Sequence, residues 1–264
     1  MIFLKLIIAK INKVYSYRRT LWNMAVKQFK AKYASSVLGI FWVIINPLLM
    51  MLAITFVFTV VFKTEINNFA LFVLSGILPW MFFSGALSEA TPSLSTQKSV
   101  LHQFSLPKEI IPLSIALSYL MNFLMSWIIV YPVFLFQKPG IIAVAVLLPV
   151  IFLLTYIFTS GVSLLFSVIN VIFRDLEHLT GTLLMFWFWV TPIFYPVEMV
   201  PGNLRWVFNF NPFSAFVLFY RDIIFYCRIP KLSTFLEVII WAFLSLLLGI
   251  LVSTWFESSA LKRI

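Results

Sequence analysis

The chain has 264 residues, of which 62% are hydrophobic and 11% are charged, and its formal net charge at pH 7 is +10. Soluble domains carry about 25% charged residues, so this composition excludes an ordinary water-soluble fold. The apolar residues form runs of about 20, the length that crosses a bilayer as a helix, whereas a β-barrel would alternate polar and apolar residues. We therefore predict an all-α polytopic membrane protein.

Residues 1–36 are predicted to lie at the cytoplasmic face. Lys5, Lys10, Asn12 and Lys13 share one side of a helical wheel, and apolar residues share the other. This pattern predicts an amphipathic helix in the membrane surface, with an ordinary packed helix as the alternative. No small-residue cleavage site follows the segment, so a cleaved signal peptide is not expected.

A single transmembrane domain is predicted over residues 37–256, followed by a cytoplasmic tail at 257–264. Its fourth apolar run is longer than one minimal crossing and is expected to tilt or to project beyond the bilayer. The six predicted spans cover residues 37–62, 69–90, 110–136, 141–173, 179–195 and 232–256.

The segment between the fifth and sixth spans, residues 197–231, is apolar but too short for two crossings of about 20 residues each. A Pro-Gly pair at 201–202 and an Asn-Pro pair at 211–212 break it. We predict a re-entrant pair of short helices that carries Arg205, Arg221 and Asp222. The alternative is a seventh span over residues 213–227.

The basic residues indicate the orientation. Six spans with the N-terminus inside place thirteen of the 19 Lys and Arg residues on the cytoplasmic side and six on the outer side. This positive-inside bias predicts that both termini are cytoplasmic, which favours six spans over seven. The positive charge is thus explained by topology and by contact with membrane lipid, and a nucleic-acid partner is not expected.

Several kinds of chemistry are missing from the sequence. No glycine is followed by lysine, which excludes a P-loop. Cys227 is the single cysteine and there are two histidines, so neither a disulfide nor a metal cluster is expected, and no cofactor is expected in this chain. Any ATP hydrolysis would need another polypeptide. The predicted spans contain almost no charged residues, which argues against proton or sodium coupling.

The most enzyme-like cluster is FRDLEHL, which contains Arg174, Asp175, Glu177 and His178. A carboxylate and an imidazole at the membrane face could act on a lipid-linked sugar phosphate, so a membrane enzyme is one alternative function. The favoured interpretation is structural or headgroup-binding. Arg174 would anchor the end of the fourth span, and Asp175 would cap the following helix.

Four stretches occur in a characteristic order: KYASSVLGIFWVIINPLL, LSGILPWMFFS, NVIFRDLEHLTGTLLMFWFWVTPIFYP and NPFSAFVLFYRDII. Together they resemble the membrane subunit of type 2 ABC transporters that export polysaccharides. The resemblance covers about residues 30–255. It implies a homodimer of six-span permease subunits in the cytoplasmic (inner) membrane of a bacterium, with two copies of a separate ABC ATPase that binds ATP and Mg.

The resemblance also implies the cargo, a glycan on a lipid carrier that is usually a polyprenyl diphosphate. O-antigen is favoured, with capsule and teichoic acid as alternatives and a small-lipid or drug exporter as a more distant one. The N-terminal helix and the 91–107 loop are implied to contact the ATPases. The candidate coupling residues in that loop are Gln97, Lys98, Leu101, His102 and Phe104.

A path for a glycan should combine aromatic rings, which stack on sugar faces, with hydroxyl or amide groups. The stretch MFWFWVTPIFYP at 185–196 is expected to supply the rings. At 100° per residue Trp187, Phe188, Thr191, Phe194 and Tyr195 share one wide helical face, and Pro192 is expected to bend the helix near its outer end. Replacement of Trp187 or Tyr195 by Ala is expected to impair export. Packing between helices is the alternative role for the polar residues. The candidate channel residues are Trp187, Phe188, Thr191, Phe194, Tyr195, Ser84 and Asn46.

Overall fold

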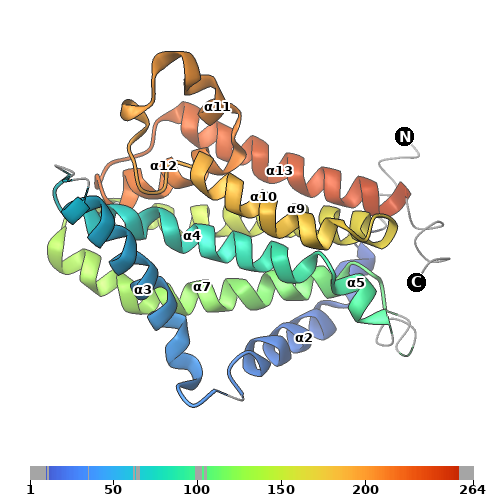
Figure 1. Cartoon of the computed structure of the whole chain (residues 1–264). Coiled ribbons are helices and arrows are strands. Elements are labelled where there is room, and N and C mark those ends of the chain that lie inside the picture. The colour runs from blue at the N-terminus through green and yellow to red at the C-terminus, as the bar shows by residue number, and fades with distance from the viewer. Residues whose placement is uncertain are drawn as a thin grey trace.

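The computed structural model describes residues 10, 12–34, 36–61, 63, 66–98, 103 and 106–255. Every regular element within these ranges is a helix (Figure 1). The predicted all-α class is therefore confirmed, and long apolar runs adopt it because a helix pairs its own backbone groups away from water. Most of the predicted N-terminal amphipathic helix and the 257–264 tail lie outside the described residues.

Five helical stretches are long and apolar enough to cross a membrane. The first combines a 3-10 turn, α3 (Trp42–Phe56) and a π-helical end. The fourth combines α8 (Ile141–Val144), a 3-10 turn and α9 (Leu148–Ile172). The five stretches are Gly39–Val61, α4 (Phe69–Ala90), α7 (Ile110–Gln137), Ile141–Ile172 and α13 (Leu232–Trp255).

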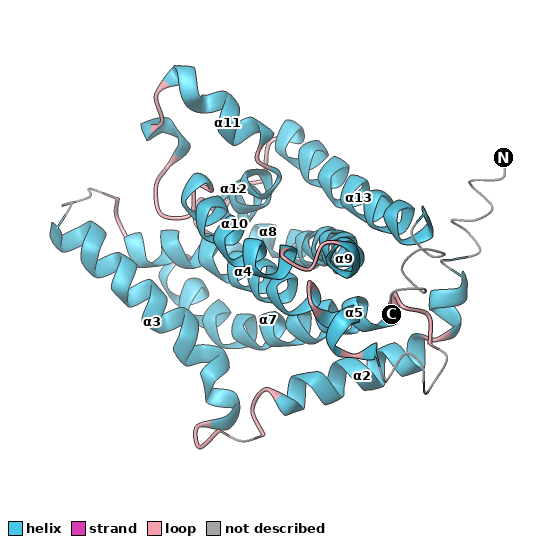
Figure 2. Ribbon diagram, turned by 45° about the vertical axis from the view of Figure 1, so that its right-hand side comes forward, coloured by secondary structure: helices cyan, strands magenta, loops and turns pink. Residues whose placement is uncertain are grey.

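Helix α4 lies at the centre of the bundle, between α3, α7, α9 and α10 (Leu176–Val190) (Figures 1 and 2). Within its most apolar 18 residues, 78% are buried inside the chain, against 11% for the Gly39–Val61 span. Since α3 is so weakly covered, its apolar face must contact lipid or another chain in the membrane. The two helices are equally plausible spans by sequence, but they have very different surroundings.

Helices α9 and α13 pack closely against each other. A Cβ added at Gly161 would overlap the backbone of Ser245, and one added at Gly249 would lie 2.5 Å from the Gly161 carbonyl oxygen. The Ser245 hydroxyl donates to the Phe158 carbonyl oxygen at 3.2 Å. Small residues that allow backbones to approach are the usual basis of helix packing in membranes.

The predicted fifth span, 179–195, is helical only in part. Helix α10 covers Leu176–Val190, and Thr191 has an extended backbone with ψ of 133°. Pro192 therefore ends the helix, where the sequence analysis expected it to bend the helix. The residue before a proline is pushed out of the α region, which accounts for the early end. At 15 residues α10 is shorter than a usual span, so the sixth crossing stays a prediction.

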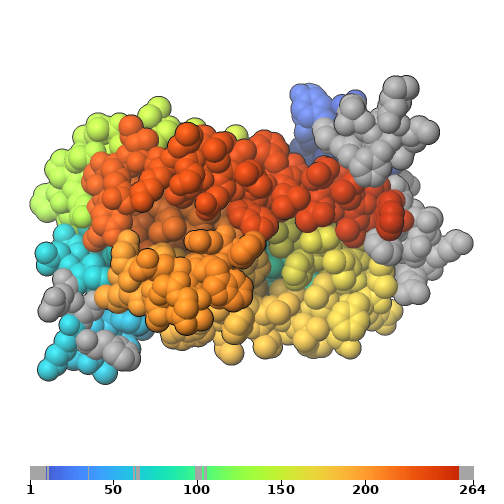
Figure 3. All heavy atoms as spheres, turned by 90° about the horizontal axis from the view of Figure 1, so that it is seen from above, coloured from blue at the N-terminus to red at the C-terminus, as the bar shows by residue number. Residues whose placement is uncertain are grey.

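Two short helices occupy the predicted re-entrant segment, α11 (Arg205–Phe210) and α12 (Pro212–Ile224). Asn211 caps α12 by accepting a hydrogen bond from the Phe213 backbone N–H, and Pro212 stands at the first helical position. The segment around residue 200 stands out from the bundle in Figure 1 and lies beside α13 in Figure 3. Helix α12 itself is buried beneath it against α4 and α13.

Helix α2 (Arg18–Ala31) packs along α7. Helix α5 (Ser93–Thr96) is the described helix of the 91–107 loop. Lys10 Nζ lies 2.7 Å from Glu109 Oε1, and the Ser253 hydroxyl donates to the same oxygen. Burial alone would raise the pKa of the Glu109 carboxyl, but Lys10 and Ser253 outweigh it and hold that pKa below its usual value. This cluster joins the N-terminal segment, α7 and α13.

Candidate functional site

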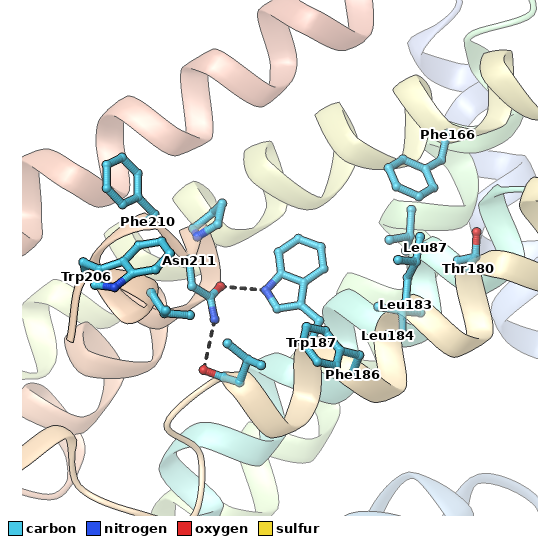
Figure 4. A pocket seen from close by; sticks show the side chains of 13 residues that line it. Leu87, Phe166, Thr180, Leu183, Leu184, Phe186, Trp187, Trp206, Phe210 and Asn211 are labelled. Atoms are coloured by element: carbon cyan, nitrogen blue, oxygen red, sulfur yellow. Dashed lines mark hydrogen bonds between the residues drawn. The ribbon is translucent and has the colours of Figure 1, made fainter. Parts of the chain in front are cut away.

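Cavities lie on two sides of α4. The first is an apolar groove of about 400 Å³ between α10 and the α11 segment (Figure 4). Trp187 and Leu183 come from α10, and Trp206 and Phe210 come from α11. In Figure 4 the Asn211 amide lies between Trp187 and the end of α10. The groove thus contains part of the aromatic stretch that the sequence analysis singled out.

Asn211 holds the polar groups at the end of this groove. Trp187 Nε1 donates to Asn211 Oδ1 at 2.6 Å, and Asn211 Nδ2 donates to Thr191 Oγ1 at 3.0 Å. The Thr191 hydroxyl donates in turn to the Trp187 carbonyl oxygen at 2.7 Å. The polar groups of Trp187 and Thr191 therefore have partners within the chain. The Asn-Pro pair was the sequence signal for this capping residue, although its hydrogen bonds to α10 could not be anticipated.

The single helical face predicted for the aromatic stretch is wrong, because the helix ends before Thr191. Phe194 is buried, with its ring 5.1 Å from Phe58 and 5.7 Å from Phe188. Tyr195 turns back, and its hydroxyl donates to the Trp189 carbonyl oxygen at 2.8 Å. Thr191, Phe194 and Tyr195 thus belong to a packed turn.

Helix α4 supplies aromatic residues that the sequence analysis missed. The Trp80 ring lies 6.3 Å from Trp187 and 5.7 Å from Phe188, and the Phe83 ring lies 5.1 Å from Trp187. Phe213 of α12 stacks on Phe83 at 4.8 Å. These contacts make Trp187 and Phe188 part of an aromatic cluster that joins three helices. Such pairs contribute about 0.5–1.5 kcal/mol each beyond the area they bury.

The second cavity, of about 560 Å³, lies on the other side of α4 and mixes polar with aromatic groups. It contains two of the candidate channel residues, Asn46 and Ser84, which lie 38 positions apart in the sequence. Within the described part of the chain, neither side chain makes a hydrogen bond. We call this space the polar–aromatic cavity. Its lining comes from the end of α2 and from α3, α4 and α7. It includes Lys32, Tyr33, Trp42, Asn46, Trp80, Ser84, Tyr119, Asn122 and Ser126.

A network of polar contacts holds the wall of this cavity. Tyr33 donates its hydroxyl hydrogen to Asn122. Lys32 Nζ lies 3.2 Å from Glu89 Oε2 and 3.1 Å from the centroid of the Tyr119 ring. Burial lowers the pKa of the Lys32 ammonium, and the Glu89 carboxylate partly offsets this effect. None of Lys32, Tyr33 and Asn122 was singled out from sequence, since their proximity depends on how α2 packs on α7.

The charged residues of FRDLEHL lie at the junction of α9 and α10: Arg174 and Asp175 form the turn, and Glu177 and His178 belong to the first turn of α10. Arg174, Asp175, Glu177 and His178 are all exposed and line neither cavity. Asp175 occupies the position before α10, but its side chain makes no capping hydrogen bond, so that part of the prediction is wrong. Among the residues that the structure describes, no group of three His, Cys, Asp or Glu could hold a metal ion.

The charged residues of the predicted re-entrant pair differ in their surroundings. Arg205 is exposed, and its Nε donates to the Val200 carbonyl oxygen at 3.2 Å. Arg221 is buried against α4, whereas Asp222 accepts from Arg228 Nε at 2.7 Å. Sequence reasoning placed Arg221 and Asp222 together on α12 but could not foresee that Arg221 points into the protein.

Of the candidate coupling residues, Gln97 and Lys98 are described, whereas Leu101, His102 and Phe104 lie outside the described residues. Gln97 directly follows α5 and lines a cavity of about 510 Å³ together with Lys27 and Gln28 of α2. The beginning of the 91–107 loop and the basic helix α2 therefore share one end of the protein.

Helices of spanning length, a central α4 and short helices before the last span define a multi-pass helical membrane protein with cavities inside its bundle. Comparison with known proteins gives the family: the chain belongs to the ABC-2 type transporter family, whose pattern it matches over residues 19–225.

Named relatives extend this comparison. The chain is 30% identical over 240 residues to the "O-antigen export system permease protein RfbA" of Myxococcus xanthus, an alignment that covers 88% of this chain and 92% of the relative. It is 32% identical over 198 residues to a protein of the same name from Klebsiella pneumoniae, with 75% of this chain and 76% of the relative covered.

Proposed function

We propose that this chain is the membrane subunit of an ATP-driven exporter that moves a lipid-linked polysaccharide, with O-antigen as the favoured cargo, across the cytoplasmic membrane of a bacterium. The observation that carries the proposal is the near full-length similarity to the O-antigen export permease of Myxococcus xanthus. The spanning helices support it, because the four from Gly39 to Ile172 lie within the family match at residues 19–225.

Membership of the ABC-2 family implies an ABC ATPase as partner. We infer that the ATPase binds ATP and Mg and docks at the end where α2 and α5 meet, with Gln97 and Lys98 at its edge. The basic character of α2 supports a cytoplasmic position for this end, because positive residues stay on that side of the membrane. Both termini are then cytoplasmic.

Two copies of the chain would form the transport path. The weak coverage of α3 supports pairing on that side, since a helix with so little contact inside its own chain has a large free apolar surface. A polyprenyl diphosphate on the glycan is the expected carrier, and its anionic headgroup would be attracted to the basic cytoplasmic face.

The polar–aromatic cavity is the best candidate for contact with sugar. Trp42 and Tyr119 offer partly exposed rings, while Asn46, Ser84 and Asn122 offer amide and hydroxyl groups. Asn46 and Ser84 are not committed to other side chains or backbone groups that the structure describes, so they are available to hydroxyl groups. The apolar groove beside Trp187 has fewer polar groups and supports a packing role.

Deletion of the chain's gene tests the proposal. In the deletion strain surface O-antigen should disappear and lipid-linked polysaccharide should accumulate in the cytoplasm. In a separate experiment, a P-loop ATPase should copurify with the intact chain. Complementation with the intact gene should restore the surface polysaccharide. Intact surface polysaccharide together with loss of export of a small amphiphile would contradict the proposal. Turnover of a polyprenyl-linked sugar by the purified chain alone would favour the alternative function, a membrane enzyme.

A further inference from the structure

A small cavity of about 190 Å³ lies where α12 ends and α13 begins. Five charged residues contribute to its lining: Arg221 and Asp222 from α12, Arg228 and Lys231 from the link to α13, and Glu198 from the turn after α10. Three cations and two carboxylates give this lining a net charge of about +1 with standard ionisation states. This cavity is separate from the apolar groove and from the polar–aromatic cavity.

Arg221 is the unusual member of this set, because its side chain is only 1% exposed. Its Nη2 donates to the carbonyl oxygens of Pro192 at 2.7 Å and Ile193 at 2.8 Å, and its guanidinium carbon lies 3.6 Å from the centre of the Phe72 ring. These contacts fix the guanidinium in place. They also leave Nε and Nη1 buried without a hydrogen-bond partner among the described residues.

The charge of Arg221 is also unbalanced. Among the described residues no carboxylate lies within salt-bridge distance of its guanidinium. The neighbouring Asp222 carboxylate is already committed to Arg228, at 2.7 Å from Nε and 2.6 Å from Nη2. The carbonyl oxygens and the Phe72 ring solvate the guanidinium but do not neutralise it. A buried charge without a counter-charge is unfavourable, so an anion beside Arg221 would supply what the chain lacks there.

We propose that this cavity binds a phosphate-type anion, held by the free N–H groups of Arg221 and by the ammonium of Lys231. Lys231 is exposed at the rim, and its ammonium makes no hydrogen bond or salt bridge within the described residues. Arginine and lysine donors form short, charge-assisted hydrogen bonds to phosphate oxygens. The phosphate could belong to a lipid headgroup or be free inorganic phosphate, and the chemistry of the site is the same for both.

The test uses the full chain purified in detergent without its ATPase, which would itself bind phosphate. Thermal unfolding is followed while inorganic phosphate replaces chloride at constant ionic strength, and separately while phosphatidylglycerol is added. We expect a saturable rise in Tm with one of the two probes. A response to phosphatidylglycerol alone would identify a lipid headgroup, and a response to inorganic phosphate would identify the free ion.

Three exposed residues allow substitution with little risk to folding. Lys231→Gln should raise the half-saturating concentration of the active probe at least about tenfold, which corresponds to 1.4 kcal/mol. Glu198→Gln should lower it, because it removes a negative charge from the lining. Arg205→Gln, a charge change of the same kind outside the cavity, should leave it unchanged. The absence of any saturable response, or equal responses in the Lys231 and Arg205 variants, would overturn the proposal.

Discussion

The two sides of α4 present aromatic residues in opposite settings. On the side of α10, Trp187 has its indole N–H bonded to Asn211 and its ring packed on Phe83. On the side of α3, Trp80 also borders a cavity in which Asn46 and Ser84 have no partner within the described chain. Aromatic residues alone therefore do not identify a path for sugar; unsatisfied polar groups beside them are the more specific feature.

The largest expected effect is a loss of stability when the hydrogen bonds of Asn211, on the α10 side of α4, are removed. Asn211→Leu removes the acceptor of the Trp187 and Phe213 N–H groups and the donor to Thr191, and should cost about 2–4 kcal/mol of folding free energy. Thermal unfolding in detergent and the amount of protein in the membrane measure the loss. Asn209→Leu, an exposed asparagine two residues earlier, is the control. Equal stability of the two variants would show that the Asn211 network is unimportant.

On the α3 side of α4, a substitution in the polar–aromatic cavity should reduce transport and leave stability unchanged. Asn46→Leu removes an exposed amide from the polar–aromatic cavity and should reduce surface polysaccharide about tenfold, the effect of about 1.4 kcal/mol on a transport barrier. Its Tm and membrane level should stay those of the wild type. Ile128→Ala changes an exposed residue of α7 outside the cavity and should export normally. Normal export by Asn46→Leu would remove this residue from the path.

A smaller change separates the ring of Trp187 from its N–H group. Trp187→Phe keeps an aromatic ring beside Phe83 but removes the hydrogen bond to Asn211, which should cost about 1 kcal/mol of stability. Export per molecule should be unchanged. Trp189→Phe, at a side chain that is 57% exposed, should change neither quantity. If export per molecule falls in Trp187→Phe at normal stability, the indole contacts the cargo and the packing interpretation fails.

The smallest expected effect concerns Lys32 at the cavity wall. Burial holds the pKa of this ammonium below its unfolded value of about 10.4. Between these two pKa values the unfolded chain binds more protons, so stability should rise with pH in that window. Lys32→Met should lose this rise in Tm, whereas Lys30→Met, at an exposed position of the same helix, should keep it. Identical alkaline profiles for wild type and Lys32→Met would contradict the assigned burial.

Sequence periodicity was sufficient for the all-α class and for the five long spans, because runs of about 20 apolar residues have few other solutions in a membrane. It failed at Thr191, because the helix ends there, directly before Pro192. The aromatic residues before and after this point therefore do not share the one helical face that continuous helical spacing predicts. It located Asn46 and Ser84 but not Lys32, Tyr33 or Asn122. Those residues meet only through the packing of α2 on α7, which no local pattern encodes.

The central claim, that the polysaccharide passes the α3 side of α4 and not the groove beside Trp187, can be measured by crosslinking. A photoreactive diazirine side chain would replace Met50, which borders the polar–aromatic cavity, or Leu183, which borders the apolar groove; both are exposed. After illumination of cells that make the polysaccharide, adducts recognised by an antibody to O-antigen should form at Met50. Adducts at Leu183 alone, or equally at both positions, would contradict the account.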